Sequence, residues 1–270
     1  MKNLLSRTIT GVTYAAIILA GILWNKYSFG AVLMFALTVC LFEFYDLVNI
    51  HKNTRINAVI NSFGGLMLFL SLANLAFGAT EPSKYCLFTF LAYIVVVLSV
   101  EIGKHRGDLS QFASILFGHC YITLPISLLY LNTFQDGNYS FIIPLALFTF
   151  IWTNDTFAYL IGITFGRHRL FERISPKKTW EGFFGGLIFT LACSLLFARF
   201  CPAIPAVYWL TLSLLTTILA TLGDLAESFI KRTLKVKDSG TALPGHGGFL
   251  DRFDSLLFAA YAIPIVKLLL

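Results

Sequence analysis

The sequence predicts an all-α integral membrane protein that crosses the bilayer with about nine helices. Of its 270 residues, 57% are hydrophobic and only 13% are charged, whereas about a quarter of the residues are charged in an ordinary soluble domain. Apolar runs of about twenty residues, long enough to cross a hydrocarbon core as helices, recur along most of the chain. A soluble core does not need such runs, so residues 1–270 are interpreted as a single membrane domain.

The predicted spans follow one another with mostly short connections. The first begins after Lys2 and Arg7, as in a signal peptide, but no clear cleavage site of small residues follows, so it is interpreted as part of the domain. Residues 1–131 hold the N-terminal helices, and residues 139–270 hold the C-terminal helices with the polar motifs. In chain order the spans are expected at residues 8–25, 29–48, 57–78, 85–101, 112–131, 139–162, 181–199, 207–230 and 253–269.

The positions of Lys and Arg predict the orientation. With the N-terminus inside, 16 of the 20 basic residues fall in cytoplasmic segments, which is the side where they gather in membrane proteins. The two large polar loops, about 163–180 and 231–252, are then cytoplasmic. The net charge of +6 is explained in the same way, and no nucleic-acid partner is expected.

The five cysteines predict neither a disulfide framework nor a zinc site. Their number is odd, they are scattered over apolar segments, and no two form a Cys-x-x-Cys pair. We expect small buried hydrophobic side chains at Cys40, Cys86, Cys120, Cys193 and Cys201.

Three polar residues of the N-terminal half have an open role. Glu43 and Asp46 lie three residues apart on one helical face near a cytoplasmic end, where extension to the interface and a functional role explain them equally well. His119, beside Gly118 and before Pro125, is interpreted as a hydrogen-bonded core histidine at a helix irregularity, with a ligand role as the alternative.

The span at 139–162 changes from apolar to polar halfway along. Asn154 and Asp155 are adjacent, and Tyr159 lies four residues after Asp155 on the same helical face. An acid within a span is destabilising unless it is solvated or used, and a basic loop follows at once. Asp155 is therefore expected in a site, and an interfacial aromatic belt with a solvated acid is the alternative.

That basic loop predicts an anion site. Ser175 followed by Pro176 is typical of a helix start, with Ser as the N-cap and Pro in the first turn. Lys177 and Lys178 would then lie in the first turn, where the helix dipole disfavours cations but outward N–H groups and two lysines suit a phosphate. Contact with anionic lipid explains the same charges equally well.

The stretch from Asp224 to Asp254 is the polar centre of the chain. It holds ten of the 34 charged residues, five acidic and five basic. So many charges must lie at the interface or line a wet cavity. If the span at 207–230 continues as a helix, spacings of three and four place one polar stripe along it, formed by Thr221, Asp224, Ser228, Lys231 and Lys235.

A glycine-rich loop follows the stripe. Gly247 and Gly248, next to His246, allow the backbone to approach a ligand closely. Asp224 and Asp251, brought together by this loop, would form an oxygen-rich site for Mg²⁺. An ion-paired hairpin on the membrane surface is the alternative, although it gives no reason for a histidine between glycines.

The spacing of these residues resembles the signature of phosphatidate cytidylyltransferases, also called CDP-diacylglycerol synthases. The matching pattern is Ser228-x-x-Lys231-Arg232, Lys237-Asp238-x-Gly240 and Leu243-Pro244-x-His246-Gly247-Gly248-x-x-Asp251-Arg252-x-Asp254. Two further stretches also resemble family motifs, namely Asn154-Asp155-x-x-Ala158-Tyr159 and Ser175-Pro176-Lys177-Lys178-Thr179-x-Glu181-Gly182. The N-terminal half resembles the family only in its apolar spans and the region of Glu43.

The resemblance implies transfer of CMP from CTP to phosphatidic acid, giving CDP-diacylglycerol and pyrophosphate. It implies Mg²⁺ or another divalent cation, a cavity open to the cytosol, and a homodimer. The length of the chain favours the bacterial form of the family, so a plasma (inner) membrane is the expected location. By the same resemblance Asp224 and Asp251 are metal ligands, Lys231, Arg232 and Lys237 meet phosphates, and Asp238 and His246 shape the nucleotide site. Other substrate contacts are expected from Asp155, Lys177, Lys178, Ser228, Gly247, Gly248 and Arg252.

Two other functions fit part of the sequence. A CTP-dependent polyprenol kinase would use the same substrate nucleotide but release CDP instead of pyrophosphate. A cation transporter would use Asp155, Asp224 and Asp251 as intramembrane sites, but it leaves the lysines unexplained. A CDP-alcohol phosphotransferase is disfavoured, because its Asp-Gly-x-x-Ala-Arg pattern is missing from the sequence.

Overall fold

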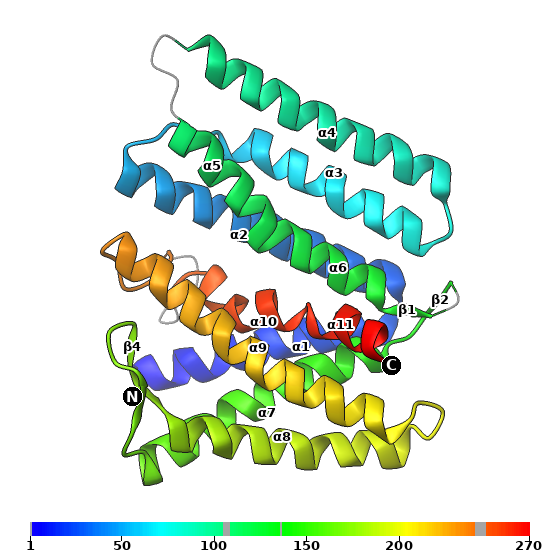
Figure 1. The fold of residues 1–270 in the computed structure, drawn as a ribbon, viewed down its shortest axis with the longest axis vertical. Coiled ribbons are helices and arrows are strands. Elements are labelled where there is room, and N and C mark those ends of the chain that lie inside the picture. The colour runs from blue at the N-terminus through cyan, green and yellow to red at the C-terminus, as the bar shows by residue number, and fades with distance from the viewer. Residues whose placement is uncertain (1, 105–108, 136, 241–246) are drawn as a thin grey trace. The chain divides into compact units, whose positions relative to one another are not determined.

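A computed structural model describes residues 2–104, 109–135, 137–240 and 247–270 (Figure 1). It is 80% helical, in agreement with the predicted all-α class, and two short antiparallel hairpins accompany the helices. The chain divides into two compact units. Unit 1 comprises Met1–Phe141 and Asp238–Arg252, and unit 2 comprises Ile142–Lys237 and Phe253–Leu270.

Unit 1 is built around helix α2. This helix contacts α1, α3, the α5–α6 region and the short helix η2, and its side chains Phe29, Leu33 and Leu37 are fully buried. Asn25 starts α2 with a capping box, since its side chain accepts a hydrogen bond from the N–H of Ser28 and its own N–H donates to the Ser28 hydroxyl at 3.0 Å. The elements of unit 1 are α1 (Lys2–Trp24), α2 (Lys26–Lys52), α3 (Ala58–Ala76), α4 (Thr80–Gly103), α5 (Leu109–Gly118), the π-helix η1 (His119–Thr123), α6 (Leu124–Asn132), the hairpin of β1 (Phe134–Gln135) and β2 (Asn138–Tyr139), and the 3₁₀-helix η2 (Leu250–Arg252).

A buried polar network joins α3, α4 and η1. His119 is 3% exposed, and its ring nitrogens lie 2.9 Å from the Tyr93 hydroxyl and 3.1 Å from the Thr123 hydroxyl. The Tyr93 hydroxyl also donates to the side-chain oxygen of Asn61. The interpretation of His119 as a hydrogen-bonded core histidine at a helix irregularity is confirmed, because His119 is the first residue of the π-helical turn.

Unit 2 is a bundle in which α9 contacts α7, α8, α10 and α11. Its core contains a chain of aromatic contacts from Phe150 through Phe197 to the fully buried Trp209, each with ring centroids 5.3 Å apart. The elements are α7 (Ile142–Phe165), the hairpin of β3 (Arg169–Phe171) and β4 (Ser175–Thr179), α8 (Trp180–Phe200), α9 (Ala206–Thr233), α10 (Asp254–Ala259) and α11 (Ala262–Leu269).

The prediction that Ser175 caps a helix beginning at Pro176 is wrong. Ser175–Thr179 is a strand whose Ser175 and Thr179 pair with Phe171 and Arg169. The helix starts four residues later than predicted, at Trp180, and the hydroxyl of its N-cap Thr179 accepts a hydrogen bond of 3.2 Å from the N–H of Gly182. The first helical turn therefore contains the acid Glu181, which the helix dipole favours, and not Lys177 and Lys178.

Helices α7 and α8 approach closely because glycines of α8 face α7. A Cβ atom on Gly182 would lie 2.7 Å from the carbonyl oxygen of Ala158, and one on Gly185 would lie 2.6 Å from the side chain of Ile161. A Cβ atom on Gly186 would clash with both the side-chain and the backbone oxygen of Asn154. Small residues at such contacts are typical of helix pairs in membranes, where close packing drives association.

Gly186→Ala is expected to destabilise unit 2 by about 1–3 kcal/mol, because the added methyl group must push α8 away from α7. The measurement is the midpoint of thermal unfolding in detergent. Gly11→Ala is the matched control, since a Cβ atom there meets nothing within 4 Å and alanine favours a helix. An unchanged midpoint in Gly186→Ala would contradict the close contact.

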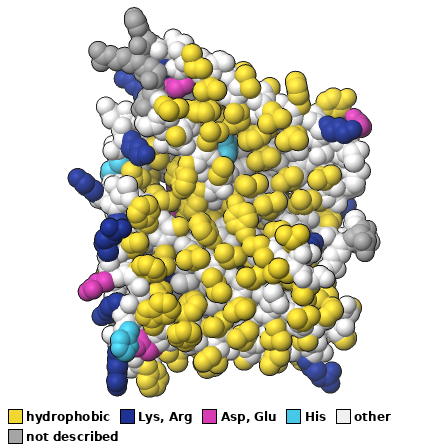
Figure 2. Space-filling view, viewed as in Figure 1, with side chains coloured by type: hydrophobic (Ala, Val, Ile, Leu, Met, Phe, Trp, Pro, Cys, Tyr) yellow, Lys and Arg dark blue, Asp and Glu magenta, His cyan; other side chains and the backbone are white. Residues whose placement is uncertain are grey.

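Six of the described helices are long and apolar enough to cross a membrane. They are α2, α3, α4, the continuous helix Leu109–Asn132, α8 and α9. Hydrophobic side chains cover most of the visible surface (Figure 2), and only 11% of the apolar window of α4 is buried. These observations support an all-α membrane protein, whereas the count of nine spans remains a prediction. The segment predicted as the ninth span is divided into α10 and α11.

The cysteines all lie within the described residues and form no disulfide, as expected. The expectation that all five are buried is wrong. Cys40 is buried in α2, but Cys120 is exposed and the other three are intermediate. In an apolar environment outside the protein, a small hydrophobic side chain has no need of burial.

Candidate active site

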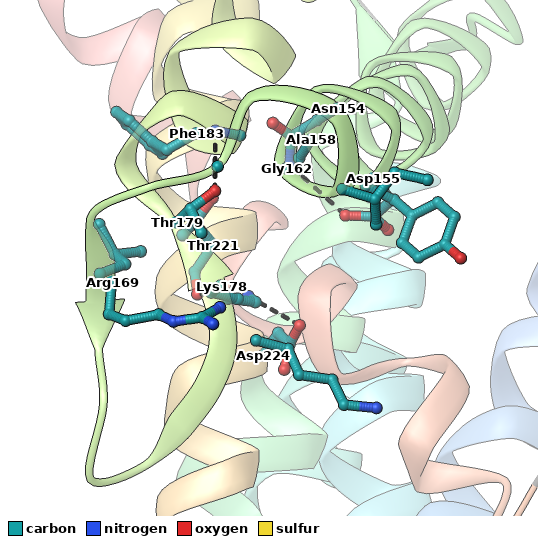
Figure 3. Close-up of a pocket in the computed structure, with 16 residues that line it drawn as sticks. Asn154, Asp155, Ala158, Gly162, Arg169, Lys178, Thr179, Phe183, Thr221 and Asp224 are labelled. Carbon is teal, nitrogen blue, oxygen red and sulfur yellow. Dashed lines mark hydrogen bonds and ion pairs between the residues drawn. The ribbon is translucent and has the colours of Figure 1, made fainter.

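A cavity of about 580 Å³ with both apolar and charged lining residues lies within unit 2. It is lined by α7, the β3–β4 hairpin, the start of α8, and α9. Figure 3 shows the hairpin side chains Arg169 and Lys178 on one side and Asp155 of α7 on the other, with Asp224 of α9 below them. Four of the predicted site residues therefore share one cavity, namely Asp155, Lys177, Lys178 and Asp224.

An ion pair between Lys178 and Asp224 connects the hairpin to α9. The Nζ atom of Lys178 lies 2.7 Å from Oδ2 of Asp224 and also donates to the carbonyl oxygen of Thr221 at 3.5 Å. The other carboxylate oxygen of Asp224 accepts a hydrogen bond of 3.3 Å from the hydroxyl of Ser228. Both charged side chains remain partly exposed, 26% for Lys178 and 34% for Asp224, so they are accessible to a ligand.

Two more carboxylates surround this ion pair. Asp155 interacts electrostatically with Lys178 and Asp224, and Asp254, at the start of α10, interacts with Asp224, Asp155 and Lys178. The three acids are matched in number by three basic side chains, because Arg169 and Lys177 line the same cavity as Lys178. Such a mixed cluster attracts cations to its carboxylates and anions to its basic side chains.

The donor atoms of this cluster fit a hard divalent cation. Mg²⁺ binds carboxylate oxygens and is usually held by one or two carboxylates together with substrate phosphates. Among the described residues, no three His, Cys, Asp or Glu side chains converge closely enough to hold a metal ion by themselves.

The predicted polar stripe of α9 is present from Thr221 to Lys231 but not beyond. Lys231 forms an ion pair of 2.8 Å with Glu227, which is only 1% exposed. Glu227 lies four residues before Lys231, a favourable spacing for such a pair on a helix. Lys235 lies after the helix end, with a positive φ of 58°, and Arg232 is exposed and donates to the carbonyl oxygen of Val236 at 3.2 Å.

The remaining predicted residues belong to unit 1 or to its boundary. Lys237 and Asp238 are exposed and lie where the chain passes from unit 2 to unit 1. Oδ2 of Asp251 accepts hydrogen bonds from the N–H groups of Ser239 at 3.2 Å and Gly248 at 2.8 Å. Gly247 has the left-handed φ of 80° that glycine permits.

Two predictions are not tested by this geometry. His246 lies outside the described residues. Asp224 belongs to unit 2 and Asp251 to unit 1, so their joint binding of one metal ion stays a prediction.

Arg252 is exposed, and its carbonyl oxygen accepts a hydrogen bond of 3.2 Å from the hydroxyl of Tyr14.

The structure adds site residues that were not assigned to the site from the sequence. Arg169 lines the cavity together with Thr221 of the predicted polar stripe, and Asp254 joins the acidic cluster. Glu181 accepts hydrogen bonds from the N–H groups of Arg167 at 3.1 Å and His168 at 3.2 Å, which fixes the entry to the hairpin. The three-residue spacing between Asp251 and Asp254 was the available signal for Asp254, whereas no local signal identifies Arg169 among the other basic residues of the loop.

Comparison with known proteins gives a consistent result. The model of the cytidylyltransferase family matches residues 5–270. The chain is 31% identical over 268 residues to the phosphatidate cytidylyltransferase of Bacillus subtilis, covering 96% of this chain and 95% of the relative. It is 34% identical over 266 residues to the enzyme of the same name from Staphylococcus haemolyticus, covering 98% of each chain, and 34% identical over 247 residues to that of Staphylococcus aureus strain COL, covering 89% and 90%.

Proposed function

The chain belongs to the cytidylyltransferase family, and from this membership we propose that it transfers a cytidylyl group from CTP to phosphatidic acid. The products are CDP-diacylglycerol and pyrophosphate. The structural observation that carries the proposal is the cavity of unit 2, in which Lys178 and Asp224 form an ion pair beside Arg169 and Lys177. Cations and carboxylates in one cavity suit two phosphate-bearing substrates and a shared divalent cation.

In the proposed reaction, an oxygen of the phosphatidate phosphate attacks the α-phosphorus of CTP. The new P–O bond forms as the bond between the α-phosphorus and the oxygen that bridges to the β-phosphate breaks, and the electron pair leaves with pyrophosphate. A phosphate monoester has a second pKa of about 6, so it is largely dianionic at neutral pH and needs no strong general base. The work of the protein is to align two polyanions that repel each other.

The residues of unit 2 divide this work. Lys177, Lys178 and Arg169 bind phosphate oxygens from the hairpin side. Asp224, with Asp155 and Asp254 near it, would hold a divalent cation. When bound, this cation supplies charge neutralisation at the phosphates. The hydroxyl of Ser228 fixes the orientation of the Asp224 carboxylate through its hydrogen bond.

The remaining residues of the signature sequence complete the proposal. Lys237 and Asp238 are exposed and available to the nucleotide, together with Arg232 of unit 2. Lys231 forms an ion pair with the buried Glu227 and is proposed to contact a phosphate through its remaining N–H donors. Asp251 is proposed as a metal ligand in addition to its role in holding the N–H groups of Ser239 and Gly248.

The location follows from the same premise. The relatives are bacterial, the chain has six helices suited to a membrane among its described residues, and 16 of 20 basic residues fall on one predicted side. We therefore place the protein in the plasma membrane with its site facing the cytoplasm. A homodimer is part of the proposal on the basis of the resemblance alone.

Release of pyrophosphate should depend on a lipid phosphate monoester. Purified protein in mixed micelles with CTP and Mg²⁺ is expected to release pyrophosphate when phosphatidic acid is present. Diacylglycerol and phosphatidylglycerol are the matched controls, because neither offers a terminal phosphate to attack the α-phosphorus. Pyrophosphate release that is equally fast with diacylglycerol, or no release with phosphatidic acid, would overturn the proposal.

A further inference from the structure

We propose that Glu43 is a positioning residue that holds together the two described ends of the signature loop of unit 1. The signature loop is the segment Ser239–Asp251, of which Ser239–Gly240 and Gly247–Asp251 are described. The inference rests on the proposed function, since it connects the shape of this loop to cytidylyl transfer. The role of Glu43 was open from the sequence, because an acid near a helix end also suits simple extension to the interface.

The carboxylate of Glu43 is hydrogen bonded to the loop at three points. Its Oε1 accepts from the N–H of Phe249 at 2.8 Å, and its Oε2 accepts from the N–H of Leu250 at 2.8 Å. The hydroxyl of Ser239 donates to Oε2 at 3.4 Å. These partners lie 196 to 207 residues from Glu43 in the sequence, so the contacts are tertiary and specific.

These hydrogen bonds join the two ends of the loop. Ser239 belongs to its first described part, and Phe249 and Leu250 belong to its last. Asp251 makes a second connection of the same kind, because its Oδ2 accepts from the N–H groups of both Ser239 and Gly248. Two carboxylates, one from α2 and one from the loop itself, therefore hold the ends together at their base.

The glycines of the loop are explained by this arrangement. A Cβ atom on Gly240 would lie 2.9 Å from Oε1 of Glu43, and one on Gly248 would lie 2.7 Å from Oε2. A Cβ atom on Gly247 would lie 2.6 Å from Oδ2 of Asp251. At Gly248 the hydroxyl of Ser239 would lie closer still, and at Gly247 the φ of 80° also favours glycine, so a side chain at these positions would displace the carboxylates or their neighbours.

The arrangement requires two acceptor oxygens at position 43. The N–H groups of Phe249 and Leu250 are directed at different oxygens of Glu43. A glutamine of the same shape offers one acceptor, and its NH₂ group must face one of the two N–H donors. Charge-assisted hydrogen bonds to a carboxylate are also stronger than those to a neutral amide. Glu43→Gln therefore disturbs the loop without removing bulk from α2.

The kinetic test compares Glu43→Gln with Asp46→Asn. Glu43→Gln is expected to lower kcat by about 30-fold and to raise the KM for CTP about fivefold, with the KM for phosphatidic acid changed by less than about twofold. Glu43→Asp, which keeps both oxygens on a shorter side chain, should recover part of the loss in kcat. Asp46 is an exposed acid on the same helix, and its neutral variant should match the wild type.

A merely structural role would give a different result. It would lower the amount of folded protein and the unfolding midpoint without separating kcat from the two KM values. Kinetic constants of folded Glu43→Gln within about threefold of the wild type would overturn the proposal.

Hydrogen exchange tests the contacts without reference to activity. In the wild type the amides of Phe249 and Leu250 should exchange slowly, and in Glu43→Gln they should exchange about tenfold faster or more. If that variant does not fold, the wild type still decides the question, because exchange of both amides at the rate of an unstructured peptide would overturn the proposal. A wild type that exchanges slowly but releases no pyrophosphate would contradict the proposed function and leave the Glu43 contacts supported.

Discussion

Asp224→Asn should lower kcat for pyrophosphate release about a thousandfold or more, in a protein that remains folded. Asp224 makes the central contacts in the cavity of unit 2, since it pairs with Lys178 at 2.7 Å and accepts a hydrogen bond from Ser228. Asparagine keeps the shape of the side chain but removes its charge. It therefore removes the partner of Lys178 and weakens the binding of a divalent cation to the cluster. A thousandfold change corresponds to about 4 kcal/mol of transition-state stabilisation.

Ser228→Ala provides the matched control for this variant. It removes only the hydroxyl that donates to Asp224 at 3.3 Å, so a loss of about two- to fivefold is expected. The unfolding midpoints of both variants should be measured beside the rates, together with the dependence of the rate on Mg²⁺ concentration. Activity of Asp224→Asn within about tenfold of the wild type at saturating Mg²⁺ would contradict the assigned role.

Lys178→Met should have the second largest effect, a loss of about a hundredfold in kcat/KM for phosphatidic acid. Lys178 is the basic residue that pairs with Asp224 and interacts with Asp155 and Asp254. Without it, Asp224 loses its ion-pair partner and the three carboxylates repel an incoming phosphate more strongly in a partly buried site. Methionine keeps most of the length of the side chain, so lost packing contributes little.

Two variants distinguish charge from position. Lys178→Arg restores the positive charge in a different shape, so its kcat/KM should be at least about tenfold higher than that of Lys178→Met. Lys177→Met removes the neighbouring lysine, which is exposed and lines the same cavity, and should lower kcat/KM by only about tenfold. Equal losses in Lys177→Met and Lys178→Met would show that general positive charge, and not the ion pair with Asp224, supports the reaction.

The helices were predictable from the sequence to within a few residues at most ends. Spans at 57–78, 181–199 and 207–230 correspond to α3, α8 and α9, because an apolar run bounded by polar residues specifies a membrane helix with little tertiary context. The last predicted span illustrates the limit. Its composition is apolar throughout, yet the structure breaks it into α10 and α11, and a break within an apolar segment leaves no signal in hydropathy.

The β3–β4 hairpin was not predictable for a different reason. Ser175 and Pro176 suit a helix start, but a proline also fits the edge of a short hairpin, so the local signals do not decide between them. The deciding interactions are tertiary. Glu181 accepts hydrogen bonds from the N–H groups at the hairpin entry, and Lys178 pairs with Asp224 of α9.

The acidic partners were hidden for a similar reason. The sequence shows that Glu43 and Glu227 are acids within apolar helices, which indicates that each requires a partner. It does not reveal that Glu43 binds backbone N–H groups about two hundred residues away, because any residue supplies such a donor. The pair of Glu227 with Lys231 follows from a spacing of four residues, and this signal was available in the sequence.

The fate of the phosphorus atoms of CTP tests the central claim most directly. Protein is incubated with phosphatidic acid, Mg²⁺ and CTP that carries radioactive phosphorus at either the α or the γ position, and the lipid fraction is then extracted and counted. Cytidylyl transfer predicts that the α label enters the lipid and that the γ label leaves as pyrophosphate. Entry of the γ label into the lipid, with CDP as the released nucleotide, would contradict the proposed transfer and identify a kinase instead.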